Sequence, residues 1–88
     1  MKAAFHESFL RDVKGIKDKT AISKIKAVIE TVERANTFDE ILHLKKMRGS
    51  RGYFRIRVGD FRIGIKLEGE TIVFVRCLDR KDIYRYFP

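Results

Sequence analysis

The stretch that decides the fold is Tyr53-Phe54-Arg55-Ile56-Arg57-Val58-Gly59-Asp60-Phe61-Arg62-Ile63-Gly64-Ile65-Lys66. Apolar and polar residues alternate strictly on both sides of Gly59-Asp60, which predicts a β-hairpin with a two-residue turn. Glycine in the first turn position favours a type II′ turn, because that position requires a positive φ. The register follows from the turn, with Arg57 opposite Arg62 and Arg55 opposite Gly64.

The two faces of this hairpin differ in chemistry. One face carries only apolar side chains, namely Phe54, Ile56, Val58, Phe61, Ile63 and Ile65. The other carries Tyr53, Arg55, Arg57, Arg62 and Lys66, and Gly64 leaves a gap in it. We expect the first face to pack on the core and the second to form a cationic surface.

Two arginines directly opposite each other on a sheet repel, at a cost of a few tenths to about 1 kcal/mol. The predicted Arg57–Arg62 pair therefore needs an explanation. Solvent and salt screen such charges on an exposed face. Alternatively, a carboxylate from elsewhere in the chain bridges them, or an anionic ligand binds between them.

The chain has the length and composition of one small domain, which we expect to span residues 1–88. Its 88 residues suffice for a single core, and 44% hydrophobic content is ordinary for a globular protein. No apolar run approaches the length of a membrane span, and the first residues lack the apolar core of a signal peptide. The single Cys77 excludes an internal disulfide and fits a reducing cytoplasm, and its apolar neighbours predict a buried side chain.

Two amphipathic helices are expected before the hairpin. After a short first strand within residues 1–5, apolar residues at helical spacing predict a first helix that ends near Gly15. A second helix of about four turns should begin at Thr20 as its N-cap and close near residues 35–36. Its apolar face comprises Ile22, Ile25, Val28, Ile29 and Val32.

The remaining segments complete an α+β fold. Residues 37–47 should pass from a loop into an extended segment through Leu42, Leu44 and Met47, and residues 49–52 should lead into the hairpin. Residues 71–78 are typical of a central strand covered on both faces, and residues 79–88 predict one helical turn or a docked tail. The predicted order is β-α-α-β-β-β, with a helical hairpin packed on a mainly antiparallel, twisted sheet.

Positive charge is concentrated in the second half of the chain. The formal net charge is +8. Residues 45–88 hold twelve Lys and Arg against five Asp and Glu, whereas residues 1–44 hold eight against seven. This asymmetry indicates an anionic partner, which is nucleic acid, an acidic protein segment, or both.

The sequence offers few groups for acid–base or metal chemistry. It has no Gly-rich phosphate loop, no Cys/His metal spacing and no Ser-His-Asp arrangement, so we expect neither a metal nor another cofactor. His6 and His43 are interpreted as surface or packing residues. Arginine suits phosphate, because its planar guanidinium stays charged and binds two oxygens at once. The acidic residues Asp79 and Asp82 are expected to pair with Arg80, Lys81 or Arg85.

These residues resemble the RelE/ParE superfamily of bacterial toxins, and the RelE branch is favoured. The resemblance spans the whole chain and rests on Leu44-Lys45-Lys46-Met47-Arg48-Gly49, Tyr53-x-Arg55-Ile56-Arg57-Val58-Gly59-Asp60-Phe61-Arg62-Ile63, Val73-x-Val75 and Asp79-Arg80-Lys81-Asp82-Ile83-Tyr84. It implies the toxin of a type II toxin–antitoxin system. That toxin would be an endoribonuclease that cuts mRNA in the ribosomal A site, without metal, by attack of the 2′-hydroxyl on the adjacent phosphate.

The resemblance also implies roles for particular residues. Arg55 and Arg57 match the two strand cations of RelE toxins, and Arg62 matches the arginine that stabilises the transition-state phosphate. Arg80 matches the arginine that protonates or stabilises the leaving 5′-oxygen, and Tyr84 the tyrosine that stacks on or orients the target base. Contacts to RNA, the ribosome or an antitoxin are expected from Lys45, Lys46, Arg48 and Arg51.

One departure from the RelE pattern concerns the proton acceptor. In the best-known pattern the two strand cations are lysines, one of them a candidate general base, whereas an arginine keeps its proton. Either the ribosome or substrate takes the proton, or the chain cuts slowly, or it belongs to another branch. The alternative is a ParE-like toxin that inhibits DNA gyrase without ribonuclease activity. Both readings imply a cognate antitoxin, a cytoplasmic location, and neither a membrane nor a small-molecule cofactor.

Overall fold

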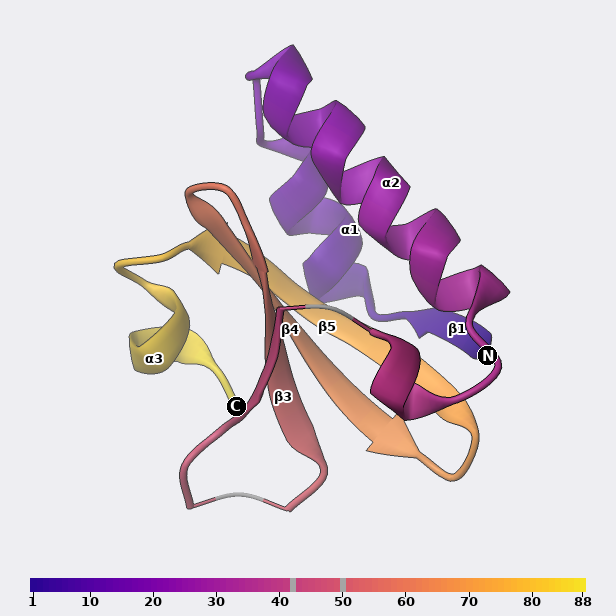
Figure 1. The fold of residues 1–88 in the computed structure, drawn as a ribbon. Helices are drawn as coiled ribbons and strands as arrows, with labels where there is room; N and C mark the ends of the chain where they lie inside the picture. The colour runs from indigo at the N-terminus through magenta and orange to yellow at the C-terminus, as the bar shows by residue number, and fades with distance from the viewer. Residues whose placement is uncertain (42, 50) are drawn as a thin grey trace.

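A five-stranded sheet organises the protein, and the computed structural model describes residues 1–41, 43–49 and 51–88 (Figure 1). The strands are β1 (Lys2–Phe5), β2 (Leu44–Lys46), β3 (Tyr53–Val58), β4 (Phe61–Glu68) and β5 (Thr71–Asp79). The helices are α1 (Glu7–Lys14), α2 (Lys19–Arg34) and α3 (Ile83–Tyr86), with a 3-10 turn at Phe38–Glu40. The sheet order is β1-β5-β4-β3-β2. Strand β1 runs parallel to β5, and the other neighbours are antiparallel.

This is the predicted α+β architecture, with the elements in the predicted order. The extended segment expected before the hairpin contributes β2, which adds an edge strand beside β3. Two predicted loop or strand positions, Leu42 and Ser50, lie outside the described residues. Within the described residues, no helix is long and apolar enough to cross a bilayer.

The β3–β4 hairpin has the register that its sequence predicts. Arg57 pairs with Arg62, and Ile56 pairs with Ile63. Gly59 adopts a φ of 59°, as the first position of a type II′ turn requires. The Ile56 and Ile63 side chains are 1% and 0% exposed, so the predicted apolar face is the core face.

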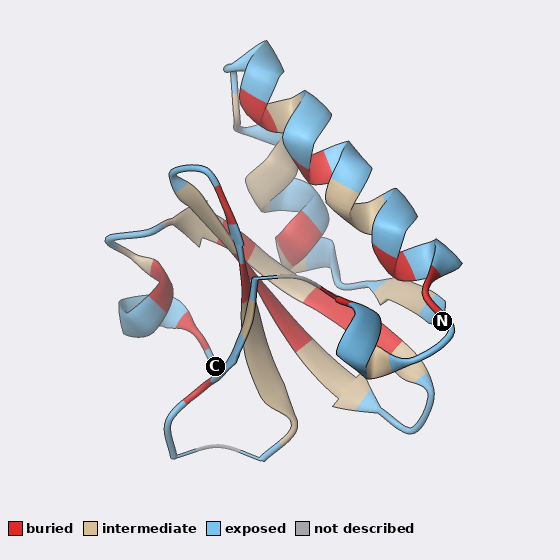
Figure 2. Cartoon of the chain, viewed as in Figure 1, coloured by how far each residue is buried: buried red, intermediate tan, exposed pale blue. Residues whose placement is uncertain are grey.

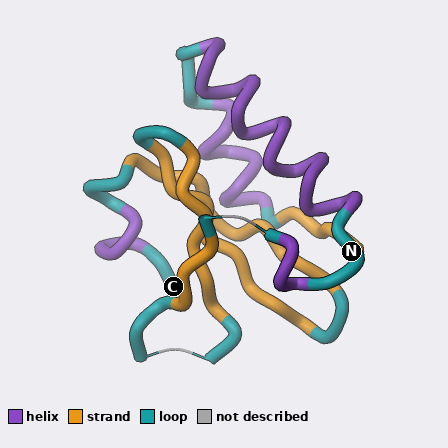
Figure 3. The backbone as a smooth tube through the Cα atoms, viewed as in Figure 1, coloured by secondary structure: helices purple, strands orange, loops and turns teal. Residues whose placement is uncertain are grey.

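Helices α1 and α2 form the predicted hairpin over one face of the sheet (Figures 1 and 3). Helix α1 ends at Gly15, as expected. The predicted N-cap of α2 is wrong, because Asp18 caps the helix instead of Thr20. The Asp18 carboxylate accepts hydrogen bonds from the backbone N–H groups of Thr20 and Ala21, at 2.9 and 3.2 Å. An ionised carboxylate also interacts favourably with the positive end of the helix dipole, an advantage that a threonine hydroxyl lacks.

The core lies between this helical hairpin and the sheet, as the buried positions in Figure 2 show. Phe9 of α1, Ile25 of α2 and Phe74 of β5 are each at most 2% exposed and belong to one cluster. Rings of Phe9 and Phe74 lie 5.3 Å apart between centroids, in a tilted arrangement. Aromatic packing of this kind adds to the stabilisation that burial provides.

Strand β5 is an interior strand, as predicted, and lies between β1 and β4, and β4 is the middle strand of the five. The pairing register slips between Gly64 and Ile65 of β4, which leaves Val75 as a bulge in β5. The extra residue shifts the alternation, so that Phe74 and Cys77 both join the core cluster under the helices.

The second face of the sheet is only partly the cationic surface that alternation predicts. The C-terminal segment forms the anticipated helical turn, α3, and also docks its tail. Ile83 and Phe87 are 0% and 3% exposed and pack with Met47 in a second apolar cluster. The Phe87 ring fills the gap at Gly64, where a Cβ would lie 2.7 Å from ring carbons. The docked tail therefore covers the middle of this face and leaves Arg55, Arg57 and Arg62 toward β2 and the hairpin turn, while Lys66 lies at the other end of β4 beside Tyr53.

One ion pair fastens α1 to β5. Arg76 donates two hydrogen bonds to Asp12, from Nε to Oδ2 at 2.7 Å and from Nη2 to Oδ1 at 3.2 Å. Oδ2 of Asp12 also accepts from the backbone N–H of Cys77 at 2.9 Å. The hydrogen bonds to Asp12 raise the pKa of Arg76. This bidentate pair holds α1 against β5.

Candidate active site

Three strands bring cations to the same side of the sheet. Strand β3 carries Arg55 and Arg57, and β4 places Arg62 opposite Arg57. Strand β2 places Lys45 opposite Arg55. Directly paired residues of an antiparallel ladder point to the same face. The four side chains therefore form one cationic face, at the edge of the sheet that α3 leaves open.

Arg57 and Arg62 turn to different acceptors. The Arg62 Nη1 donates to the backbone oxygens of Gly59 and Phe61, both at 2.9 Å, whereas Nη2 of Arg57 lies 3.3 Å from Nδ1 of His43. Among the described residues, the ion pairs leave both arginines out, so a bridging carboxylate does not explain their pairing. Burial lowers the pKa of Arg62, and the neighbouring guanidinium groups lower it further. A bound anion would relieve this repulsion.

Tyr84 of α3 reaches the same face. Nε of Arg55 donates a hydrogen bond to the Tyr84 hydroxyl oxygen at 3.0 Å. This bond lowers the pKa of Tyr84, and the charges of Arg55, Lys45 and Arg62 lower it further. The Tyr84 side chain is 62% exposed, so it leaves a ring face open while Phe87 pins the tail.

Arg80 approaches from the loop that follows β5. Its backbone N–H donates to the carbonyl oxygen of Asp60 in the hairpin turn at 2.9 Å. Its exposed guanidinium lies near enough to Arg62 to contribute to the lowered pKa of that residue. The structure thus gathers the five residues predicted to be catalytic, Arg55, Arg57, Arg62, Arg80 and Tyr84.

Two shallow hollows lie beside these residues. One, of about 270 Å³, is lined by His43, Leu44, Lys45, Arg55 and Arg57. The other, of about 370 Å³, is lined by Lys45, Lys46, Arg48 and Tyr84. Three of the four residues predicted to contact RNA therefore border the second hollow, and Arg51 lines neither.

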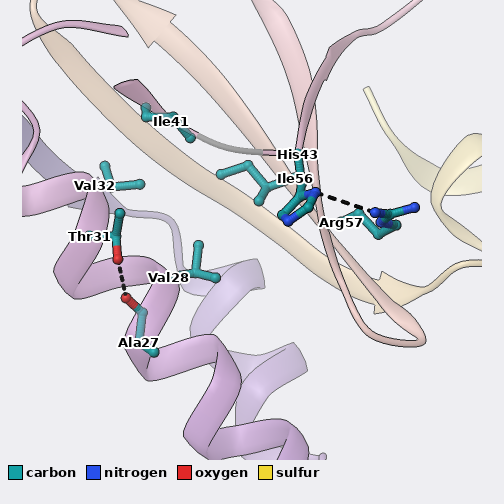
Figure 4. Close-up of a pocket in the computed structure, with 8 residues that line it drawn as sticks. All are labelled: Ala27, Val28, Thr31, Val32, Ile41, His43, Ile56 and Arg57. Carbon is teal, nitrogen blue, oxygen red and sulfur yellow. Dashed lines mark hydrogen bonds between the residues drawn. The ribbon is translucent and has the colours of Figure 1, made fainter. Parts of the chain in front are cut away.

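The contact between His43 and Arg57 was missed by the sequence reasoning. His43 precedes β2 with a φ of 61°, and its carbonyl oxygen accepts from the Arg57 backbone N–H at 3.1 Å. Figure 4 shows the imidazole against the guanidinium, at the end of an apolar groove of about 170 Å³ between α2 and β3. The available signal was the alternation His43-x-Lys45-x-Met47, which mirrors Tyr53-x-Arg55-x-Arg57 across the ladder.

The acidic residues at and after the end of β5, Asp79 and Asp82, do not form the predicted ion pairs. Oδ1 of Asp79 accepts from the backbone N–H of Lys81 at 2.9 Å. No ion pair in the described part of the chain includes Asp79 or Asp82, and the backbone N–H of Asp82 donates to the carbonyl oxygen of Asp79 at 2.8 Å. Cys77 is buried as predicted, and burial raises the pKa of its thiol to about 12. In the ranges that the structure describes, no cluster of His, Cys, Asp and Glu could hold a metal ion.

A comparison with protein families identifies the family of this chain. Residues 3–84 match the family model described as the ParE toxin of the type II toxin–antitoxin system parDE. The chain belongs to this family. This chain is 43% identical to a relative, Toxin RelE3 of Methanocaldococcus jannaschii, over the full length of both proteins. It is 28% identical to Putative toxin RelE1 of the same organism, covering 88% of this chain and 86% of the relative.

Solved structures place this ParE-family chain in the RelE branch. It matches a chain of the RelB-RelE antitoxin-toxin complex from Methanococcus jannaschii with a TM-score of 0.82 and 41% identity, covering 97% and 99% of the two chains. The archaeal RelE-RelB complex from Pyrococcus horikoshii matches with a TM-score of 0.71 at 16% identity, over 90% and 93%, and shows the fold alone. The predicted resemblance is confirmed, and the protein is a type II toxin of the RelE type.

Proposed function

We propose that this RelE-type toxin is a ribosome-dependent mRNA endoribonuclease. The observation that carries the proposal is the grouping of Arg55, Arg57 and Arg62 with the Tyr84 hydroxyl, which lies 3.0 Å from Nε of Arg55. Guanidinium groups suit a phosphodiester, and an exposed aromatic ring suits an unstacked base. RNA supplies the nucleophile itself, because each 2′-hydroxyl lies next to a phosphate.

The proposed chemistry places negative charge where the arginines are. When the 2′-hydroxyl attacks the phosphorus and the bond to the 5′-oxygen breaks, charge develops on the phosphoryl oxygens. Arg62, with Arg57 opposite it, is assigned to stabilise that charge. An anion favours the charged form of Arg62, which burial and neighbouring cations disfavour in the free protein. Arg80 is assigned to the leaving oxygen and Tyr84 to the target base.

The proposed substrate is mRNA in the ribosomal A site, which places the activity in the cytoplasm. Backbone contacts to mRNA and ribosomal RNA are assigned to Lys45, Lys46, Arg48 and Arg51. Contacts of this kind are independent of sequence and weaken with salt.

A cognate antitoxin completes the proposal. The matched structures from Methanococcus jannaschii and Pyrococcus horikoshii are complexes of RelE with RelB. An antitoxin with a partly disordered acidic segment would fold across the cationic face and neutralise it. Because Arg55, Arg57 and Tyr84 are exposed or half-buried, such a segment would cover them directly.

The first test is to induce this chain alone in bacteria and to map cleavage of translated messages by primer extension. We expect cuts within codons that disappear when translation initiation is blocked. The double variant Arg62→Ala/Arg80→Ala should lose cleavage, since one electrostatic donor contributes about 10²–10³-fold in such sites. The matched control is the Arg34→Ala variant, which should cleave as the wild type does. Arg34 pairs with Glu30 on the exposed side of α2.

Antitoxin binding and thermal unfolding report whether the variants remain folded. Cuts that persist in the folded double variant would show that the site assignment is wrong. Growth arrest with intact messages and a DNA-damage response would instead favour the ParE-like alternative, inhibition of DNA gyrase.

A further inference from the structure

We propose that His43 is the proton acceptor of the cleavage reaction, and that its Nδ1 becomes available when Arg57 moves its hydrogen bond to the substrate phosphate. The inference rests on the proposed ribonuclease function and supplies a base that the predicted site lacks. Arg55, Arg57 and Arg62 remain protonated at any accessible pH, so none of them can take the proton.

The main chain holds His43 at the site. The hydrogen bond from the Arg57 backbone N–H to the His43 carbonyl oxygen continues the β2–β3 ladder by one pair beyond β2. The φ of 61° places His43 in the left-handed region, which residues other than glycine adopt uncommonly. The ring lines the 270 Å³ hollow together with Arg55 and Lys45. It therefore lies next to the groups assigned to the phosphate.

The contact with Arg57 defines which ring nitrogen carries the proton. A guanidinium can only donate, so Nδ1 of His43 accepts and the neutral ring carries its hydrogen on Nε2. The other charged groups that face this position are also cations, from Lys45, Arg55 and, opposite Arg57, Arg62. Helix α2 contributes the uncharged side chains Ala27, Val28, Thr31 and Val32. The free protein thus holds the Nδ1 lone pair of His43 against Arg57, beside a cluster of cations.

Substrate binding exchanges the acceptor of Arg57. A guanidinium binds a phosphate oxygen more strongly than a neutral imidazole, because the guanidinium and the phosphate carry opposite charges. Arg57 therefore moves to the phosphate and frees Nδ1 of His43. The 2′-O–H bond breaks as its proton passes to Nδ1, the O2′–P bond forms, and the P–O5′ bond breaks. The 5′-oxygen takes a proton from water, and the imidazolium returns its proton to solvent.

The competing explanation is that His43 only orients Arg57, and two substitutions separate these roles. His43→Asn places Oδ1 near the position of Nδ1, so it keeps an acceptor for Arg57 but takes no proton. Asparagine also tolerates the left-handed backbone better than most residues. His43→Gly suits the same backbone and leaves space for a free imidazole.

The experiment measures single-turnover cleavage of ribosome-bound mRNA between about pH 5 and pH 8, where imidazoles titrate. We expect the wild-type rate to rise with pH. Both variants should lose about 10²–10⁴-fold, the range of general-base catalysis, together with that rise. Added imidazole should restore cleavage to His43→Gly in proportion to its unprotonated fraction, and not to His43→Asn. His6→Asn is the matched control, because His6 lies exposed at the start of α1 and makes no side-chain capping bond.

The outcomes separate this inference from the proposed function. If His43→Asn cleaves like the wild type, or is slow but keeps the wild-type dependence on pH, His43 orients Arg57 and the inference is overturned, while the ribonuclease stands. If the wild type does not cleave ribosome-bound mRNA at all, the proposed function fails, and the inference fails with it.

Discussion

The fit of the Phe87 ring against Gly64 predicts that these two positions are strongly coupled. A methyl group at residue 64 would lie 2.7 to 2.8 Å from three ring carbons, whereas carbon atoms pack best at about 3.5–4.0 Å. Phe87 is 3% exposed, and Ile83 and Met47 pack beside it, so the ring has little room to shift. Gly64→Ala should therefore lower the free energy of unfolding by about 1–3 kcal/mol, the usual cost of overpacking. This loss would occur although alanine is ordinarily favoured over glycine in a strand by about 0.5–1 kcal/mol.

A double-mutant cycle in urea tests this prediction. In a Phe87→Ala background the clash is gone, so Gly64→Ala should be neutral or stabilise by up to about 1 kcal/mol. The two positions should then show a coupling of about 1–4 kcal/mol, the difference between the costs in the two backgrounds. Gly15→Ala is the control, because its Cβ would make an ordinary 3.5 Å contact with the Asp12 carbonyl oxygen. An equal cost of Gly64→Ala in both backgrounds would refute the proposed contact.

Three further predictions concern single side chains. Asp12→Ala should lower the free energy of unfolding, measured in urea, by about 1–3 kcal/mol, because it leaves the partly covered Arg76 guanidinium unpaired. Asp12→Asn keeps a hydrogen-bond acceptor and should lower the free energy of unfolding by less. Equal losses in the two variants would show that the negative charge of Asp12 does not contribute. The free energy of unfolding should fall as pH rises from 9.0 toward about 12, because the Cys77 thiol keeps its proton to a higher pH in the folded chain than in the unfolded chain. The Cys77→Val variant should lack this contribution. Rapid alkylation of the Cys77 thiol in the native protein at pH 8 would contradict its burial. Tyr84→Phe should change the free energy of unfolding by less than about 0.5 kcal/mol. It should also remove from an absorbance titration the phenol whose pKa is lowered by Arg55. Arg55→Gln should raise the pKa of the Tyr84 phenol, and an unchanged titration would show that the hydrogen bond does not lower this pKa.

The hairpin could be predicted in full from the sequence because its determinants are local. Two alternating segments and a Gly-Asp turn specify the register, and the register alone places Arg55, Arg57 and Arg62 on one face. The prediction that Arg80 and Tyr84 belong to the site rested only on the resemblance to RelE toxins. Periodicity does not reveal them, because α3 is held on the sheet by the fit between Phe87 and Gly64.

The features that sequence reasoning missed are pairings between distant segments. The Asp12–Arg76 ion pair joins α1 to β5, and neither residue stands out among its neighbours in the sequence. The His43–Arg57 contact depends on the pairing of β2 with β3, and the short alternation His43-x-Lys45-x-Met47 does not by itself show which strand it pairs with. The prediction of the α2 N-cap was wrong for a different reason. Asp18 and Thr20 are both residue types that cap helices well, and the path of the connecting loop determines which of them takes the position.

The parallel pairing of β1 with β5 has a consequence for the kinetics of folding. Residues 2–5 pair with residues 71–74, so β5 gains its second neighbour only when two remote parts of the chain meet. Closing such a long loop costs entropy before any contact compensates for it, and contacts of this kind slow folding. Until this loop closes, β5 lacks the neighbour that completes the sheet, although the local β3–β4 hairpin can already hold Arg55, Arg57 and Arg62 on one face. We therefore expect the joining of β1 to β5 to limit how soon after synthesis the fully folded toxin appears.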